Sequence, residues 1–224
     1  EAYVLNASCG NPVVAEICIS RWSTDGIGLT YDDAAKVTSI GVKGSSIFSN
    51  NKNITSFDEL QYFINVKSMS ADWLSSVNGY DGALAGCSNM TSVKLPPNLT
   101  TVDQFSLYNC NSADIDITDS LLNAQTIGQY AFGNCNRLKG SLVAPNLTSL
   151  ANNAFRNTMI EMLLDMGKIT SIAGASNAGT FYRCDSLHTA ILPPTLTSLA
   201  AGALFYCENL STIVCKAVTP PTIQ

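Results

Sequence analysis

Short runs in which apolar residues alternate with Thr and Ser recur along most of this chain. One kind of run is represented by Met90-Thr-Ser-Val93-Lys-Leu95, and a second, shorter kind by Leu147-Thr-Ser-Leu150 and Leu196-Thr-Ser-Leu199. Apolar residues on one side with small hydroxyl residues on the other are typical of short strands that bury one face. In three repeats a proline follows the first run, which suits the end of a strand because proline has no N–H to donate. The pattern therefore predicts pairs of short strands joined by turns.

A cysteine precedes the first strand of most pairs at a nearly constant distance. We name this position the anchor, and it is occupied in turn by Cys87, Cys110, Cys135, Thr158, Cys184 and Cys207. Successive anchors are 23, 25, 23, 26 and 23 residues apart. Repeats of roughly 20–29 residues are typical of leucine-rich solenoids, in which each repeat buries its apolar face only by stacking on its neighbours. We therefore predict a repeat solenoid, a right-handed leucine-rich-repeat, β-rich array of short strands and turns.

The regularity of the repeats divides the chain into three parts. Residues 1–36 are predicted to form a small, partly helical N-terminal cap, since a solenoid must cover its first open repeat. Residues 37–82 contain irregular first repeats, with a short helix predicted over 56–63 from the spacing of Leu60 and Phe63, followed by an insertion. Residues 83–224 contain the regular repeats. The last residues, 217–224, resemble a repeat that is begun and not completed, so a continuation beyond Gln224 stays an open alternative.

Composition excludes several classes of function. Hydrophobic residues make up 46% of the chain and charged residues 13%, which does not fit a disordered chain. The net charge of −5 argues against binding to nucleic acid, which requires clustered Lys and Arg. No apolar run approaches the roughly 18 residues that span a bilayer. The residues after Glu1 lack the pattern of a secretory signal peptide, in which a basic region precedes an apolar one. We therefore expect that an export signal has been removed or never existed.

Five of the eight cysteines lie at anchor positions and are expected to be free. Equivalent side chains on stacked strands lie about 4.8 Å apart and parallel, whereas a disulfide needs converging Cβ atoms about 3.8 Å apart. The anchors are therefore predicted to be buried small residues with free thiols. Cys9 and Cys18 lie outside the repeats, and a bond between them stays open. A bond between Cys207 and Cys215 is the less favoured alternative.

A segment over residues 22–33 is similar to a degenerate calcium loop of the EF-hand or dockerin kind. Asp25 and Asp33 remain as weak metal-ligand candidates, but Ser23 and Ile27 stand where carboxylates are needed. Loss of two carboxylates should weaken calcium binding severely, so we predict an acidic turn that leads into a helix. We expect no cofactor.

The other candidates for chemistry are sparse. Asp114, Asp116 and Asp119 are expected to share one face of a strand and to face water rather than a metal. His188 is the only histidine, so the chain has neither a Cys/His zinc set nor a redundant Ser-His-Asp arrangement. We therefore predict that the protein is not an enzyme.

Aromatic residues give the candidate binding surface. Tyr108, Tyr182 and Tyr206 stand in the same turn of different repeats and are predicted to form a stripe along one edge. Tyrosine is favoured in protein recognition because it combines contact area with a polar tip. The alternative is that these side chains half-cover the hydrophobic interior. Trp73 and Tyr80, in the insertion, come nearest to a sugar-binding arrangement.

The repeats resemble the BspA-type leucine-rich repeat of secreted and surface proteins of bacteria and some protists. The resemblance rests on the step Ala131-Phe-Gly-Asn-Cys135, on first strands that end in Pro-Pro, and on second strands of the Leu-Thr-Ser-Ile type, and it covers about residues 83–224. It implies an exported protein, extracellular or on the cell surface, that acts in adhesion.

We therefore predict non-enzymatic protein–protein binding through the extended surface of the solenoid. The expected partners are host or matrix proteins, or other surface proteins. Two alternatives stay open: a structural spacer that presents another domain, and a carbohydrate-binding module for glycans.

Overall fold

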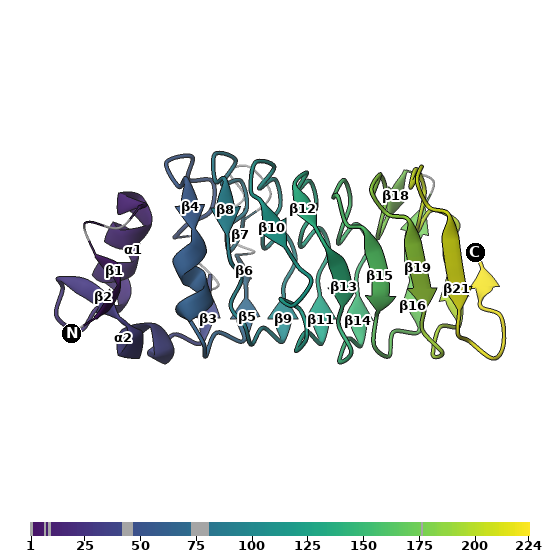
Figure 1. Ribbon diagram of the computed structural model, residues 1–224, viewed down its shortest axis with the longest axis horizontal. Helices are drawn as coiled ribbons and strands as arrows, with labels where there is room; N and C mark the ends of the chain where they lie inside the picture. Colours follow the sequence, from purple (N-terminus) through teal and green to yellow (C-terminus); the bar gives the residue numbers. More distant parts are fainter. Residues whose placement is uncertain (1, 7, 9, 42–46, 73–80, 176) are drawn as a thin grey trace.

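Two ladders of parallel strands run along the length of the molecule and form a straight solenoid (Figure 1). The structure is a computed structural model that describes residues 2–6, 8, 10–41, 47–72, 81–175 and 177–224. The solenoid has the leucine-rich-repeat architecture predicted from the spacing of the anchors. It contains little helix, and a small region with helices stands at its N-terminal end.

The first ladder contains strands of two to four residues, most of which follow an anchor. Its members are β4 (Ser56–Phe57), β8 (Ser92–Val93), β10 (Ile115–Asp116), β12 (Leu138–Lys139), β13 (Ser141–Val143), β15 (Met162–Asp165), β19 (Thr189–Leu192) and β21 (Thr212–Cys215). A parallel bridge between Ser92 and Asp114 connects β8 to the next repeat. Strands β13, β15, β19 and β21 form one parallel sheet in that order.

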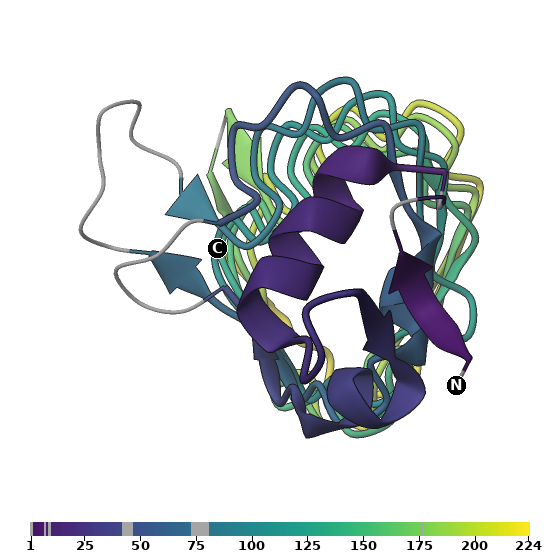
Figure 2. The ribbon, with the colours of Figure 1, turned by 90° about the vertical axis from the view of Figure 1, so that its left-hand side faces the viewer.

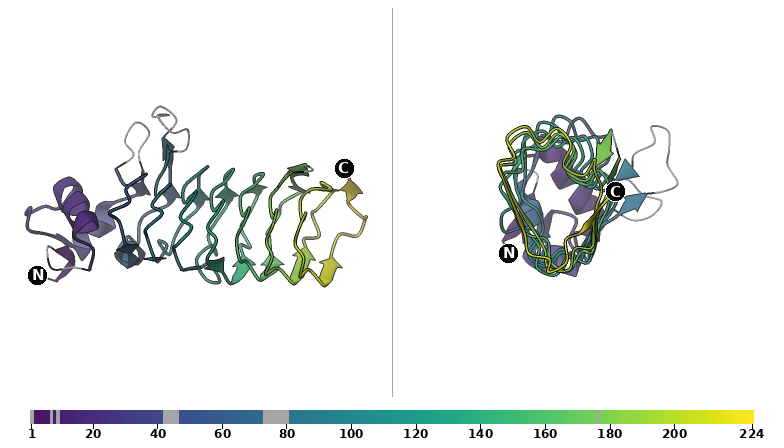
Figure 3. Two further views of the ribbon diagram at one scale, coloured as in Figure 1. Left: turned by 90° about the horizontal axis from the view of Figure 1, so that it is seen from above. Right: turned by 90° about the vertical axis from the view of Figure 1, so that its right-hand side faces the viewer.

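The second ladder contains the two-residue strands of the Leu-Thr-Ser-Ile type. Its members are β3 (Ser39–Ile40), β5 (Ser68–Met69), β9 (Thr101–Val102), β11 (Thr126–Ile127), β14 (Ser149–Leu150), β16 (Ser171–Ile172), β20 (Ser198–Leu199) and β22 (Thr222–Ile223). Two short antiparallel pairs project from the side of the solenoid (Figure 3). They are β6 (Ala71–Asp72) with β7 (Asp81–Gly82), and β17 (Gly174–Ala175) with β18 (Ala178–Gly179).

The first ladder changes its pairing partner at Gly140. Leu138 and Lys139 pair with the preceding repeat, whereas Ser141 pairs with Met162 of the following one. Gly140 lies between them with φ +91°, a value that L-residues with a side chain rarely adopt. The glycine therefore separates β12 from β13 and divides the ladder into two sheets.

Aromatic rings fill the centre of the solenoid. Phe132, Phe155 and Phe181 are fully buried, and each stands three residues before its anchor. The ring centroids of Phe132 and Phe155 are 5.2 Å apart and those of Phe155 and Phe181 are 5.6 Å apart, in nearly parallel planes. Stacking of equivalent side chains thus continues through the core from one repeat to the next.

The N-terminal region covers the first open repeat, as Figure 2 shows for α1. It contains β1 (Tyr3–Asn6), α1 (Pro12–Trp22), β2 (Gly28–Thr30) and α2 (Tyr31–Lys36). The buried Asn11 is the N-cap of α1, and its Nδ2 donates to the carbonyl oxygen of Ser56, 3.0 Å away in β4. Trp22 packs against Phe48 and Phe63. These contacts join the helical region to the array.

The helix predicted over 56–63 is present only as a single 3₁₀ segment, η1 (Asp58–Tyr62). Ser56 and Phe57 belong instead to strand β4, which pairs with β8. The sequence Ile54-Thr-Ser-Phe57 resembles a second-ladder strand but lies in the first ladder. The buried Phe57 is needed in the core next to Val93, and this pairing prevents the helix from starting at Ser56.

Candidate functional site

The anchor cysteines form a ladder of thiols along the interior. Each Sγ donates to the carbonyl oxygen of a residue in the preceding repeat, as from Cys110 to Leu84, Cys135 to Leu107 and Cys184 to Phe155, all at 3.1 Å. At the anchor without cysteine, the hydroxyl of Thr158 donates to Phe155 at 2.9 Å. The predicted free, buried thiols are confirmed at Cys87, Cys110, Cys135 and Cys184, whereas Cys207 is only partly buried.

Burial makes the inner thiols poor nucleophiles. Desolvation raises the pKa of Cys87 and of Cys135 to about 12, so thiolate is scarce at neutral pH. Cys215 is free and exposed, so it does not pair with Cys207. Cys18 is free and buried, while Cys9 lies outside the described residues. The inner ladder is therefore structural.

The tyrosines predicted to form one stripe lie in two separate clusters. Tyr108 is partly buried and packs edge-on against Phe105 and Tyr130, with ring centroids 5.5 and 5.3 Å away. Tyr182 and Tyr206 lie further along, with their centroids 5.5 Å apart. Between the two clusters, the position of Tyr108 and Tyr182 is occupied by other residues, so the stripe is interrupted.

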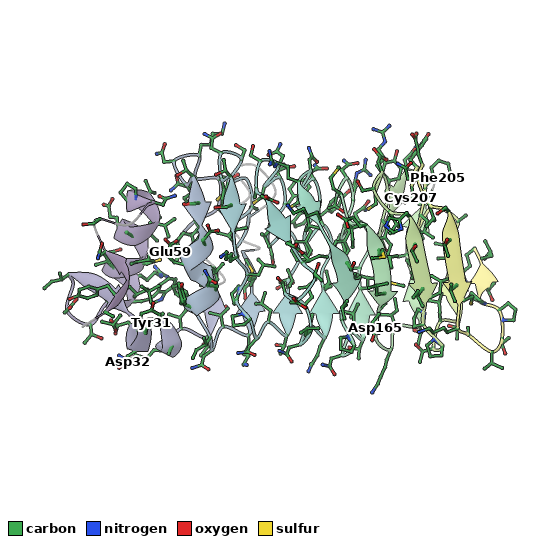
Figure 4. The ribbon with its side chains drawn as sticks, in the orientation of Figure 1. Tyr31, Asp32, Glu59, Asp165, Phe205 and Cys207 are labelled. Atoms are coloured by element: carbon green, nitrogen blue, oxygen red, sulfur yellow. The ribbon has the colours of Figure 1, made fainter. Side chains whose placement is uncertain are left out.

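Two arginines, which the sequence analysis missed, complete the second cluster. The guanidinium carbon of Arg156 lies 4.4 Å from the ring centroid of Tyr182, and that of Arg183 lies 5.3 Å from the centroid of Tyr206. Tyr182 is only 6% exposed beneath them, whereas Phe205 and Tyr206 are 41% and 46% exposed. We name these five residues the arginine–tyrosine edge. Phe205 and the neighbouring Cys207 stand at the upper corner of the C-terminal repeats in Figure 4.

The backbone at this edge is left-handed. Arg183 has φ +55° and Tyr206 has φ +60°, and both stand directly before an anchor. At the same position other repeats carry Gly86 or asparagines, which tolerate such angles. A left-handed conformation costs a residue with a large side chain about 1 kcal/mol. Arg183 and Tyr206 therefore occupy backbone positions at which glycine or asparagine would be more stable.

A groove lined mainly by asparagines runs beside this edge. Its volume is about 360 Å³, and it is lined by Asn109, Asn111, Asn134, Asn136, Asn157, Thr158, Met159, Arg183 and Asp185. We name it the asparagine groove. The Nδ2 of Asn134 donates to Oδ1 of Asn109 at 2.8 Å, and the Nδ2 of Asn157 donates to Oδ1 of Asn134 at 2.6 Å. The sequence signal that could have found it is the asparagine before three successive anchors.

Comparison with known proteins decides the family. The sequence matches the BspA type Leucine rich repeat region, in six copies, over residues 44–180 and 123–220. The chain belongs to the BspA-type leucine-rich repeat family. This confirms the resemblance noted in the sequence. Among curated proteins, none matches the chain.

Two solved structures are similar to this BspA-type array. One is the Leucine Rich Repeat protein of T. pallidum (TpLRR), with 17% identity and a TM-score of 0.48, covering 86% of this chain and 66% of that one. The other is a leucine rich cell surface protein of Faecalibacterium prausnitzii A2-165, with 12% identity and a TM-score of 0.28, covering 71% of this chain and 62% of that one. The chain thus spans about two thirds or less of either protein. None of the helices in the described part of the chain has the length and hydrophobicity that a membrane span requires.

The acidic loop of the BspA-type chain is stabilised by donors within the protein. Asp25 accepts hydrogen bonds from the backbone N–H groups of Ile27 and Gly28 and from the Tyr3 hydroxyl, and these bonds lower its pKa to about 2. Asp33 is buried and accepts from Thr24, among other donors. The predicted turn leads directly into α2, where Thr30 and Asp33 form a capping box. Both carboxylates are thus used in holding the turn together.

Replacing Asp33 with asparagine is expected to lower the free energy of unfolding by about 1 kcal/mol at pH 7. The hydrogen bond from the Thr24 hydroxyl, the first of several, holds the pKa of Asp33 well below its usual range. A lowered pKa stabilises the fold above the unfolded value of about 3.9, and this contribution is lost as the pH falls through the folded value. Urea titrations of both proteins at pH 7 and below pH 4 check this. A difference that grew on acidification would contradict the assignment.

The three aspartates predicted to share a face do so only in part. Asp114 and Asp116 are exposed and alternate with buried residues along the strand, but Asp119 lies in the turn that follows. Asp114 pairs with Lys139 at 3.0 Å, and the pKa of Asp116 is lowered mainly by a hydrogen bond from the backbone N–H of Thr118. They line a hollow of about 690 Å³ between η1 and β12. Within the described ranges, no three His, Cys, Asp or Glu side chains form a group that could hold a metal ion.

The remaining candidates lie apart from this surface. Trp73 and Tyr80 lie outside the described residues. His188 is exposed on the first ladder, with its Nδ1 3.0 Å from the Thr189 hydroxyl. The structure therefore brings together Tyr182 and Tyr206 of the predicted binding residues, and places Tyr108 in a separate cluster.

Proposed function

We propose that this chain is a non-enzymatic binding protein, exported and displayed at or beyond the cell surface. Its partners are host or matrix proteins or other surface proteins. Family membership supports a binding role, and the buried anchor thiols and the solvent-facing His188 supply no nucleophile–base pair. The arginine–tyrosine edge is the proposed contact surface.

The observation that carries this proposal is that Arg183 and Tyr206 combine a left-handed backbone with exposed side chains. Phe105 and Tyr130 of the first cluster are also left-handed, but their side chains are only partly exposed. Residues kept in a costly conformation are typical of functional sites. Arginine and tyrosine are also the residue types that dominate binding energy at protein interfaces. The exposed faces of Phe205 and Tyr206 offer apolar area, and Arg183 offers hydrogen-bond donors beside them.

The two arginines favour an acidic partner surface. Arg156 also donates from Nη1 to the carbonyl oxygen of Asn177 at 2.8 Å, which fixes its plane over Tyr182. A guanidinium group fixed in this way loses little freedom when a carboxylate binds it. The edge is therefore suited to a partner that presents carboxylates next to an apolar side chain.

The test is a binding screen of the purified chain against laminin, collagen and fibronectin, with the variants Arg183→Asn and Tyr206→Asn. Asparagine restores the residue type that Asn134 and Asn157 provide at the same backbone position. Each variant should therefore keep or slightly raise the melting temperature and weaken binding about tenfold or more.

Tyr130→Asn is the matched control, because Tyr130 also has a left-handed backbone, with φ +54°, but belongs to the other aromatic cluster. It should leave binding unchanged. Saturable binding that Tyr130→Asn weakens and Tyr206→Asn does not would move the site to the first cluster. If the chain binds none of the three matrix proteins, the result would favour the alternative that it is a structural spacer presenting another domain.

A further inference from the structure

The asparagine groove presents neutral hydrogen-bonding groups at regular intervals. One wall contains Asn109, Asn134 and Asn157, which precede three successive anchors, and Asn111 and Asn136 lie beyond the anchors. Stacked strands lie about 4.8 Å apart, so equivalent amides repeat at about this distance along the solenoid. The groove is thus a periodic surface that spans several repeats.

Hydrogen bonds within the wall fix the orientation of each amide. A carboxamide has two N–H donors and an oxygen with two lone pairs. In the ladder, Asn134 gives one N–H to Asn109 and one lone pair to Asn157. One donor and one acceptor of Asn134 therefore remain for a ligand, and the amide cannot rotate without breaking both bonds of the ladder.

Backbone geometry explains only part of this arrangement. Asn109, Asn134 and Asn157 have φ values of +62°, +59° and +54°, which asparagine tolerates well. Asn111 and Asn136, however, are exposed and follow their anchors, where other repeats carry Met159 or Asp185. The backbone of the turn does not require asparagine at these two positions. Backbone geometry therefore does not explain why Asn111 and Asn136 line the same groove as the other asparagines.

We propose that the asparagine groove binds a neutral oligosaccharide that lies along the axis of the solenoid. A sugar hydroxyl both donates and accepts, so it can pair with either half of a carboxamide. The one cation and the one anion of the lining, Arg183 and Asp185, balance each other. Met159 is 45% exposed in the lining and offers an apolar contact for the C–H face of a sugar ring.

The spacing of the groove also favours a sugar chain over a peptide. An extended peptide advances about 3.3 Å per residue, which is out of step with repeats about 4.8 Å apart. Successive repeats offer equivalent amides to the hydroxyl groups that recur along an oligosaccharide.

The experiment is isothermal titration of the full chain with neutral β-linked oligosaccharides of two to six units, from cellulose, xylan and chitin, alongside a glycan array. Binding should be saturable and should strengthen with chain length until the groove is filled. Asn134→Gly should weaken it about tenfold or more, because glycine keeps the positive φ while the centre of the ladder is lost. Asn136→Ala should weaken it as well.

Asn123→Ala is the control, since Asn123 is exposed in a turn outside the groove, with its Nδ2 3.5 Å from the carbonyl oxygen of Pro97. It should bind as the parent does, and all variants should keep the parent's circular dichroism spectrum. Absence of binding to every neutral glycan, or binding unaffected by Asn134→Gly, would overturn the proposal. Binding confined to acidic glycans would also overturn it.

Arg183 lines the groove and also belongs to the arginine–tyrosine edge, so variants at residues that the two sites do not share separate them. Tyr206→Asn tests the arginine–tyrosine edge and leaves the asparagine groove intact, and Asn134→Gly does the reverse. Loss of matrix-protein binding in the first variant, with glycan binding retained, would show two separate sites.

Discussion

Replacing Phe155 with alanine is expected to lower the free energy of unfolding by about 3–5 kcal/mol. The Phe155 ring is fully buried between the rings of Phe132 and Phe181, at centroid distances of 5.2 and 5.6 Å. Its removal loses the transfer free energy of a large apolar side chain and leaves a cavity that two rigid neighbouring rings cannot close. Urea denaturation followed by circular dichroism measures the change.

The control is Phe205→Ala, because Phe205 is also aromatic but 41% exposed at the last repeats. Its loss should cost about 1 kcal/mol or less. Since each repeat contacts only its neighbours, the Phe155 variant is also expected to show a broadened or divided transition as the two halves uncouple. Equal effects of the two substitutions would contradict the view that stacked rings stabilise the centre of the array.

Replacing Gly82 with alanine is expected to cost about 2–4 kcal/mol. A Cβ at Gly82 would stand 1.9 Å from the carbonyl oxygen of Phe105 and 2.6 Å from the backbone N of Ser106. Both obstacles are backbone atoms of the adjacent repeat, so the two repeats must move apart. Thermal unfolding measured by circular dichroism reports the loss.

Gly10→Ala serves as the matched substitution, because a Cβ at Gly10 meets no other atom within 4 Å. Its effect should stay within about 0.5 kcal/mol. A similar loss in both variants would mean that the general cost of losing glycine, and not the close approach of the repeats, governs stability here.

The solenoid architecture could be predicted because one position of each repeat, the anchor, is nearly always cysteine. The anchors fix where each repeat begins, and the residue three positions earlier fills the core, as Phe132 and Phe155 do. The change of pairing partner at Gly140 could not be predicted, since it depends on which neighbouring strands lie close enough to pair on each side of the glycine. The strand at Ser56–Phe57 was missed because local spacing favoured a helix, and tertiary pairing with β8 prevailed.

The candidate surface was predicted only in part for a related reason. Repeat positions placed Tyr182 and Tyr206 together, but they gave no information on side-chain direction. The arginine above Tyr182 comes from the preceding repeat, and its contact with the ring follows from the stacking of repeats. The left-handed backbone at Arg183 could not be predicted from the sequence either, because arginine rarely adopts this conformation.

The two projecting antiparallel pairs show where extra residues can be inserted into the solenoid. Ser68 of β5 pairs directly with Thr101 of β9, although the β6–β7 hairpin lies between them in sequence. The β17–β18 pair follows β16 just as β6–β7 follows β5. The chain can therefore leave and re-enter the array at this corner without disturbing either ladder. The corner is a natural attachment point for grafted epitopes or reporter peptides, which would add a new property to the scaffold without changing its length.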